Sequence, residues 1–297
     1  MPLTHNELAI LLQSAVSAAV EAGDFISQKS KEPFTVEQKE GGDSAASQVV
    51  TEVDRMAQDI ILKSLKPTIS TYDLGLLTEE SEDDNSRFAK DYFWCIDPLD
   101  GTLPFIESSP GYSVSIALVA KDGSPTIGVV YDPVKSALYQ AIAGQGAFKD
   151  GNSWSVQSHP PNANLTMISD RSFLQHPRFK EIDIGCKEIS KMVGLNNVDL
   201  IGHGGGAMNA CWVSELNPAC YFKFPKTEKG GGSLWDYAAT ACILGEAGAH
   251  VSDIHGEKLD LNRSDSTFMN HRGILYASNT EIARHIMELY NKLIKKQ

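Results

Sequence analysis

The chain begins with apolar residues at the spacing of an α-helix. Thr4 and Glu7 form a capping-box pair, and the apolar residues after them recur three and four positions apart. We predict a first helix that ends near Gln28. Segment 39–48 is small, polar and contains glycine, which is typical of a flexible loop. A second helix is predicted to begin at 51–54, with an apolar stripe made by Val53, Ala57, Ile60, Ile61 and Leu65.

From Phe93 onward the hydrophobic pattern changes to short runs that favour β-strands. Four such runs, separated by proline, glycine and aspartate turn signals, occupy 93–97, 112–120, 125–133 and 136–144. They predict a twisted, largely antiparallel sheet.

Beyond Gly151 the pattern is mixed. Strands are predicted near 165–169 and 219–224, and helices near 177–193 and 234–247. We place a boundary near residue 155. It divides the chain into an amino-terminal α+β half, residues 1–155, and a carboxy-terminal α/β half, residues 156–297.

Composition limits the classes of partner and compartment. The chain has 26 Lys and Arg against 38 Asp and Glu, a formal net charge of −12. This negative charge argues against a nucleic-acid duplex or an anionic membrane as the main partner, and it is typical of a protein that binds cations. The five cysteines include no Cys-x-x-Cys pair, so we interpret them as buried thiols of a reducing compartment. No signal-peptide pattern or bilayer-length apolar run is seen, and we expect a cytoplasmic or organelle-stromal protein.

The stretch DPLDGT, residues 97–102, follows an apolar strand and combines two carboxylates with a turn. Pro98 fixes φ and lets the chain turn early. Asp97 and Asp100 could then converge on one hard cation, with the Leu99 carbonyl as a third oxygen ligand. The next two amides would be free to bind a phosphate oxygen. Asp-Pro and Asp-Gly also mark ordinary turns, so the stretch alone leaves a metal site and a plain turn both open.

Further carboxylates accompany this stretch. An apolar segment ends in Glu79 and Glu80, Asp54 lies in the first turn of the second predicted helix, and Asp236 begins a later helix after Trp235. An aspartate at a helix start is most often only a cap. Taken singly, Asp54 and Asp236 therefore have a purely structural interpretation.

Four segments, in the order 50–54, 77–81, 97–102 and 235–239, resemble the inositol monophosphatase superfamily of magnesium-dependent, lithium-sensitive phosphomonoesterases. The resemblance covers most of the chain, and four ordered motifs together are highly specific. It implies an α/β (α+β) fold, a five-layered α-β-α-β-α sandwich with a metal site between its halves. It also implies two or three Mg²⁺ ions per site and inhibition by Li⁺.

The resemblance also implies a role for each motif. The metal ligands would be Glu79, Asp97, the Leu99 carbonyl, Asp100 and Asp236, of which all but Asp236 lie in the amino-terminal half. Asp54, Glu79 and Thr102 would be the catalytic residues that orient and polarise water. The amides of Gly101 and Thr102 would hold the phosphate, with Asp100 and Asp236 also facing the substrate. Glu80 is expected to be structural.

Charge explains why such a site would need metal. A phosphomonoester dianion repels hydroxide, so cations must neutralise it, acidify a bound water and stabilise the leaving alkoxide. Neither Gly-x-Ser-x-Gly nor Cys-x5-Arg is present to supply a protein nucleophile. The Asp-x-Asp-x-Thr motif of haloacid-dehalogenase phosphatases does not fit, because two residues separate Asp97 from Asp100. Direct attack by water is therefore the predicted mechanism.

Within the superfamily, segments 97–102, 114–134 and 247–270 look similar to the 3'(2'),5'-bisphosphate nucleotidase branch, whose substrate is 3'-phosphoadenosine 5'-phosphate. Two differences from the sequence pattern of that branch argue against this assignment. That branch commonly has Lys or Arg-Glu where this chain has Leu103 and Pro104, and its Ser-x-x-Lys segment is missing. The stretch GGGAMN, residues 204–209, resembles the inositol monophosphatase branch instead.

Candidate substrate residues come from two stretches. The first supplies Gly206, Ala207 and Asn209. The second is basic and could replace the missing charge through Lys223, Lys226 and Lys229. A solvated loop is the alternative for this basic stretch, and the glycines at 230–232 permit movement under either interpretation.

The leading prediction is a bisphosphate nucleotidase that acts on 3'-phosphoadenosine 5'-phosphate. The alternative is an inositol monophosphatase, or a histidinol or sugar phosphate phosphatase. An alternative of another class is a relative that binds metal and ligand without turnover, which the intact acidic set and Thr102 disfavour. We expect a small phosphorylated metabolite as partner, neither a nucleic-acid polymer nor a membrane, and either a monomer or a homodimer.

Overall fold

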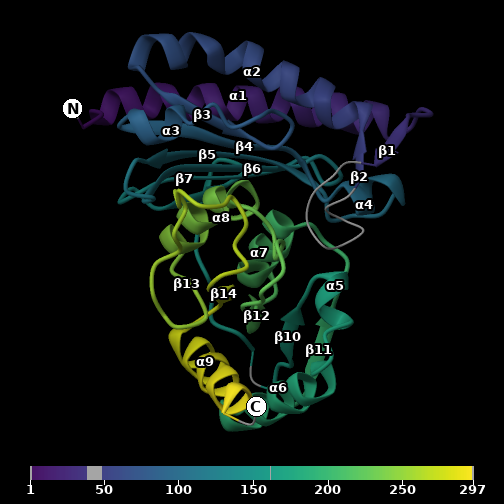
Figure 1. The fold of residues 1–297 in the computed structure, drawn as a ribbon. Coiled ribbons are helices and arrows are strands. Elements are labelled where there is room, and N and C mark those ends of the chain that lie inside the picture. The colour runs from purple at the N-terminus through teal and green to yellow at the C-terminus, as the bar shows by residue number, and fades with distance from the viewer. Residues whose placement is uncertain (1, 39–48, 161, 296–297) are drawn as a thin grey trace.

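The computed structural model describes residues 2–38, 49–160 and 162–295, so the predicted loop at 39–48 lies outside the described residues. Its elements stack in five layers, α-β-α-β-α (Figure 1). α1 (His5–Lys29) and α2 (Glu52–Tyr72) form the first layer, α7 (Gly206–Glu215) and α8 (Leu234–Glu246) the third, and α6 (Phe179–Met192) and α9 (Thr280–Ile294) the fifth. The predicted sandwich is confirmed.

The first layer forms where capping and periodicity predicted it. The Glu7 amide donates to the Thr4 hydroxyl and the Thr4 amide to the Glu7 carboxylate, which completes the capping box of α1. Thr51 and Asp54 form the same box at the start of α2. Among the described helices, α1 alone is long and apolar enough to cross a bilayer by length and composition. The helix lies along α2 and the first sheet (Figure 1). Its apolar residues belong to the core cluster between them, as in the core helix of a folded domain.

Within the described ranges, the first sheet has seven strands, in the order β3-β4-β5-β6-β7-β8-β9. β3 and β4 are parallel and all other neighbours are antiparallel, as predicted. The β4–β5 register shifts between Asp97 and Asp100, and such a bulge bends the end of a strand. The strands are β3 (Gly75–Thr78), β4 (Tyr92–Asp100), β5 (Ser113–Ala120), β6 (Pro125–Asp132), β7 (Ala137–Ile142), β8 (Ala147–Lys149) and β9 (Asn152–Trp154).

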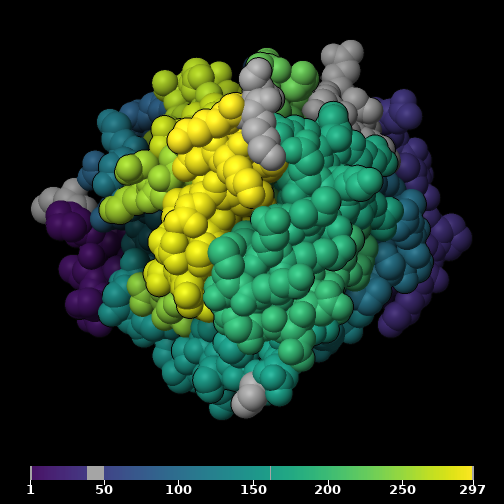
Figure 2. Space-filling view, turned by 90° about the horizontal axis from the view of Figure 1, so that it is seen from below, coloured from purple at the N-terminus to yellow at the C-terminus, as the bar shows by residue number. Residues whose placement is uncertain are grey.

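The second sheet has five strands in the part of the chain that the structure describes, in the order β11-β10-β12-β14-β13. β10 is parallel to both of its neighbours and the remaining pairs are antiparallel. α6 and α9 lie side by side on the outer face, where Figure 2 shows the yellow carboxy-terminal helix against the green-teal segment. The strands are β10 (Leu165–Ile168), β11 (Val198–Ile201), β12 (Ala219–Lys223), β13 (His250–Ser252) and β14 (Ile274–Ala277).

Short elements complete the described chain. They are β1 (Val36–Gln38) paired with β2 (Val49–Thr51), and the helices α3 (Ser86–Ala89), α4 (Thr102–Ile106) and α5 (Arg171–Leu174). The chain passes from the first sheet to the second between Trp154 and Leu165, beside the boundary placed at residue 155. The halves are closely packed, because α8 lies against β5 and β6 of the first sheet.

Candidate active site

Three aspartates converge where the end of β4 meets the start of α8. Asp97 and Asp100 lie at the end of β4, and Asp236 lies in the first turn of α8. One carboxylate oxygen from each lies within 4.8 Å of the others. Glu79 follows β3, where its amide donates to the Ile96 carbonyl at 3.2 Å, and its carboxyl hydrogen-bonds to that of Asp97. These four residues, the acidic cluster hereafter, bring together the side chains predicted as metal ligands.

Burial raises the pKa of the aspartates in the acidic cluster. The pKa values of Asp97 and Asp100 lie well above the usual range, because burial and then neighbouring carboxylates disfavour their charged forms. Burial, followed by the charge of Glu79, raises the pKa of Asp236 to about 6, although the Lys223 ammonium opposes this shift. Ionised carboxylates this close and this buried require a compensating cation. Because all the donors are hard oxygens, the cluster fits Mg²⁺.

A hydrogen bond joins Thr102 to Asp54 beside this cluster. The Thr102 hydroxyl donates to Asp54 Oδ1 at 3.1 Å, and both residues are buried. Asp54 Oδ2 accepts from the Thr51 amide at 2.8 Å and from the Thr51 hydroxyl at 2.5 Å. Burial raises the pKa of Asp54 to about 6 in spite of these bonds. The capping box of α2 therefore fixes the carboxylate that contacts Thr102.

The start of α7 closes the site from the carboxy-terminal half. The amides of Gly206 and Ala207 donate to Asp100 Oδ1 and Oδ2 at 2.9 and 2.8 Å. This approach requires a glycine at 205, since a Cβ there would lie 2.5 Å from Asp100 Oδ2. Gly101 has a φ of 89°, which lets α4 begin directly after β4. Two residues predicted to bind substrate thus hold a carboxylate of the acidic cluster.

The other predicted substrate residues have polar partners within the protein. Lys223 ends β12, is buried and forms an ion pair with Asp170. Asn209 is fully buried, and its Nδ2 donates to Asp170 Oδ1 at 3.1 Å and to the Gly204 carbonyl at 3.0 Å. The Lys226 amide donates to the Asn270 carbonyl at 2.9 Å, which ties the basic loop to the segment before β14.

Asp170 is a residue of the site region that the sequence analysis missed. It lies two residues after the end of β10, much as Glu79 follows β3, and a carboxylate after an apolar strand was the signal that could have found it. Its partner Lys223 was instead grouped with the lysines of the basic loop.

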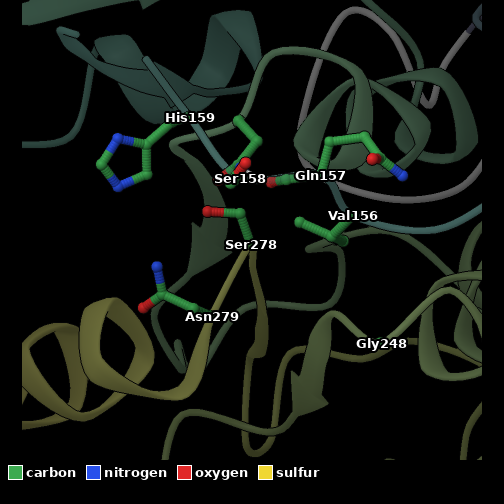
Figure 3. Close-up of a pocket in the computed structure, with 8 residues that line it drawn as sticks. Val156, Gln157, Ser158, His159, Gly248, Ser278 and Asn279 are labelled. Carbon is green, nitrogen blue, oxygen red and sulfur yellow. Dashed lines mark hydrogen bonds between the residues drawn. The ribbon is translucent and has the colours of Figure 1, made fainter. Parts of the chain in front are cut away.

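A hollow of about 360 Å³ lies elsewhere, between the segment after β9 and the start of α9. Figure 3 shows Ser158, His159, Ser278 and Asn279 around it. None of the predicted site residues lines this hollow, so it is separate from the acidic cluster.

Residues 7–296 match the model of the inositol monophosphatase family. The chain belongs to this family. Its members are phosphatases that in general depend on Mg²⁺, so the predicted family and enzyme class are confirmed.

Relatives within the family carry different names. The 3'(2'),5'-bisphosphate nucleotidase CysQ of Escherichia coli O6:H1 is 32% identical over 88% of this chain and 97% of its own. The inositol-1-monophosphatase of Synechocystis is 31% identical over 86% of this chain and 83% of its own. The crystal structure of the extragenic suppressor protein suhB from Bartonella henselae shares the fold, with a TM-score of 0.73 and 24% identity over 95% of this chain and 99% of that one.

Proposed function

We propose that the protein is a Mg²⁺-dependent 3'(2'),5'-bisphosphate nucleotidase that hydrolyses 3'-phosphoadenosine 5'-phosphate to AMP and phosphate. The convergence of Asp97, Asp100 and Asp236 beside the Thr102–Asp54 bond carries the proposal of a metal-dependent reaction. The name of the Escherichia coli relative and the segments 114–134 and 247–270 support the substrate.

We assign the metal site to the acidic cluster and the Leu99 carbonyl. Glu79, Asp97, Asp100 and Asp236 would hold two or three Mg²⁺ ions, and Li⁺ would inhibit by competing for this site. When bound, the ions supply positive charge that neutralises the phosphate dianion and lowers the pKa of water. The two amides of α7 keep the Asp100 carboxylate in place for this role.

Thr102 and Asp54, with Glu79 nearby, would orient the attacking water. The Thr102 hydroxyl donates its proton to Asp54 Oδ1, which leaves its oxygen lone pairs to accept a hydrogen bond from water. The proton released on attack can then move through Thr102 Oγ1 towards Asp54 Oδ1. The amides of Gly101 and Thr102 would hold a phosphate oxygen.

Inositol monophosphatase is the second candidate. The stretch 204–209 and the name of the Synechocystis relative favour it. Lys223 also argues for it, because a lysine paired with Asp170 has to leave that partner before it can bind a second phosphate. A phosphatase that acts on histidinol phosphate or a sugar phosphate is an alternative within the same enzyme class. A relative that binds metal and ligand without turnover is the candidate from a different class of protein.

Phosphate release in Mg²⁺ tests these proposals, with and without Li⁺. The substrates are 3'-phosphoadenosine 5'-phosphate, inositol 1-phosphate, histidinol phosphate and fructose 1,6-bisphosphate. A preference for the nucleotide supports the proposal, whereas a preference for inositol 1-phosphate replaces it with the second candidate. No release from any substrate favours the relative without turnover.

We further propose that the protein acts in the cytoplasm or an organelle stroma, as a monomer or a homodimer. All five cysteines are free and buried, which supports a reducing compartment.

Replacing Thr102 with alanine is expected to lower kcat by about 10²-fold and to change KM little, because the hydroxyl acts on the water rather than on the substrate. Thr102→Ser keeps the hydroxyl and is the matched control, expected to retain most of the rate. Steady-state kinetics on the preferred substrate measures both. A higher KM at unchanged kcat would move Thr102 from chemistry to binding.

The stabilisation that Mg²⁺ gives the protein is expected to shrink as pH falls from 7.5 to 5.5. The folded-state pKa values of Asp54 and Asp236, about 6, exceed the unfolded value of about 3.9. Without metal, ionisation of these two carboxyl groups therefore lowers the stability of the folded protein as pH rises through 4–6. At higher pH more carboxylates are ionised, so bound Mg²⁺ offsets more repulsion between them and stabilises the protein more. His176, His250 and His271 have lowered pKa values and shift stability the other way, but equally with and without metal.

Differential scanning calorimetry in Mg²⁺ and in EDTA measures this difference in Tm. A Mg²⁺-induced increase that stays constant or grows towards pH 5.5 would contradict the prediction.

A further inference from the structure

Lys223 and Asp170 form a nearly buried ion pair between neighbouring strands. Lys223 ends β12 and Asp170 lies two residues after the end of β10, and the two strands are paired in parallel. The side chains are 10% and 21% exposed. Burial lowers the pKa of Lys223, but Asp170 and Tyr237 together outweigh this effect, so the lysine is held in its charged form. Two charges placed this deep are stable only while both remain paired and hydrogen-bonded.

The Asp170 carboxylate also connects the pair to the start of α7. Its Oδ1 accepts from Asn209 Nδ2 at 3.1 Å and from the Tyr221 hydroxyl at 2.7 Å. Asn209 donates in turn to the Gly204 carbonyl at 3.0 Å. The first turn of α7 is therefore fixed to Asp170, and this turn supplies the two amides that hold Asp100.

The Lys223 ammonium connects the same pair to the start of α8. It hydrogen-bonds to the Tyr237 hydroxyl and lies 5.3 Å from the centroid of the Tyr237 ring. The Tyr237 hydroxyl donates to the Gly231 carbonyl at 2.9 Å, and Tyr237 directly follows Asp236. The two helix starts are also in contact, because a Cβ at Gly206 would lie 3.0 Å from the Asp236 Cβ.

We propose that Lys223 and Asp170 are positioning residues that hold the starts of α7 and α8, and through them Asp100 and Asp236, in one arrangement. Lys223 then acts through the protein rather than by gripping a substrate phosphate. The effects that we expect on Mg²⁺ affinity and turnover rest on the proposed function. The effect that we expect on the start of α7 does not depend on the proposed function.

Hydrogen–deuterium exchange of the metal-free protein tests the positioning directly. In Lys223→Met and Asp170→Asn, amides in residues 204–212 should exchange about tenfold faster or more. Asp170→Asn weakens the anchor of the first turn of α7, and Lys223→Met leaves that anchor, Asp170, buried without its cation. Lys223→Arg should stay near the wild-type rate. Lys149→Met is the matched control, because it breaks the ion pair with Glu215 at the other end of α7. It should leave exchange at 204–212 unchanged.

Isothermal titration with Mg²⁺ is the second readout. Loss of a residue that orients metal ligands typically weakens metal affinity by about 10–100-fold, and we expect this for Lys223→Met and Asp170→Asn. The double variant Lys223→Met with Asp170→Asn should bind Mg²⁺ no more weakly than Lys223→Met alone, because it leaves no uncompensated charge. Lys149→Met should bind like the wild type.

Two results would overturn the positioning role. In the first, both single variants lower Tm as Lys149→Met does, while exchange at 204–212 and Mg²⁺ affinity stay at wild-type values. In the second, Lys223→Met raises KM for a bisphosphate only, which would make Lys223 a substrate contact. If the wild type binds no Mg²⁺ and releases no phosphate, the proposed function is wrong instead. The hydrogen–deuterium exchange measurement then still tests whether Lys223 and Asp170 position the start of α7.

Discussion

Replacing Asp97 with asparagine is expected to remove Mg²⁺ binding at the acidic cluster and to lower kcat by about 10³-fold or more, with the fold retained. Asn is isosteric with Asp and can still accept the bond that the Leu99 amide donates to Asp97 Oδ1 at 3.0 Å. It cannot supply the negative charge that a divalent cation requires. Losing several kcal/mol of metal-dependent transition-state stabilisation corresponds to this change in rate.

The same substitution is expected to make the metal-free protein more stable. Burial and the charges of Glu79, Asp100 and Asp236 all oppose ionisation of Asp97, so an amide relieves repulsion in the folded state. Each kcal/mol relieved raises the Tm of a chain of this size by about 1.5–2 °C. Loss of activity together with a higher Tm in EDTA would indicate that the variant lacks a metal ligand. Loss of activity with a lower Tm would indicate that its fold is damaged.

Asp199→Asn is the matched control for Asp97→Asn. It makes the same chemical change at an exposed position of β11, where the Asp199 carboxylate accepts a hydrogen bond from Asn164 Nδ2 at 3.0 Å. We expect wild-type Mg²⁺ affinity, kcat and Tm. If Asp97→Asn also kept kcat within about threefold of the wild type, the metal assignment would be wrong, because losing a ligand costs far more.

Local rules predicted the two helix starts that carry Asp54 and Asp236, and the family resemblance assigned these residues to the site. Asp54 and Asp236 had been interpreted singly as helix caps, and both do cap helices, since they accept from the amides of Thr51 and Ser233. The same position in the first helical turn brings each carboxylate to the site. A helix cap can thus also carry the role proposed for these carboxylates, which a single helix start could not reveal.

Long-range pairing is what the sequence could not show. α7 was not among the predicted helices, because all but the last of its residues are buried and it therefore shows no amphipathic stripe. Lys223 was grouped with Lys226 and Lys229 by proximity in the chain. Its partner, Asp170, is 53 residues away, and only the parallel pairing of β10 with β12 brings them together.

Replacing Gly205 with alanine is expected to lower kcat by about 10²-fold or more and to weaken Mg²⁺ binding. Gly205 has a φ of −67°, so alanine fits the backbone and the effect is purely steric. The new methyl group would lie 2.5–2.7 Å from the carboxylate atoms of Asp100. Asp100 must then move and lose its bonds to the Gly206 and Ala207 amides. A displacement of about 1 Å at a reacting group can cost about 10²-fold in rate.

Gly245→Ala is the matched control, because Gly245 lies within α8 and a Cβ there meets nothing within 4 Å. It should keep kcat and Mg²⁺ affinity and gain about 0.5–1 kcal/mol in the free energy of unfolding, as expected for glycine to alanine in a helix. Steady-state kinetics, titration with Mg²⁺ and thermal unfolding compare the two variants. Wild-type kcat in Gly205→Ala would show that catalysis does not require the hydrogen bonds between Asp100 and the start of α7. It would also contradict the proposal that Lys223 and Asp170 act by positioning Asp100 through α7.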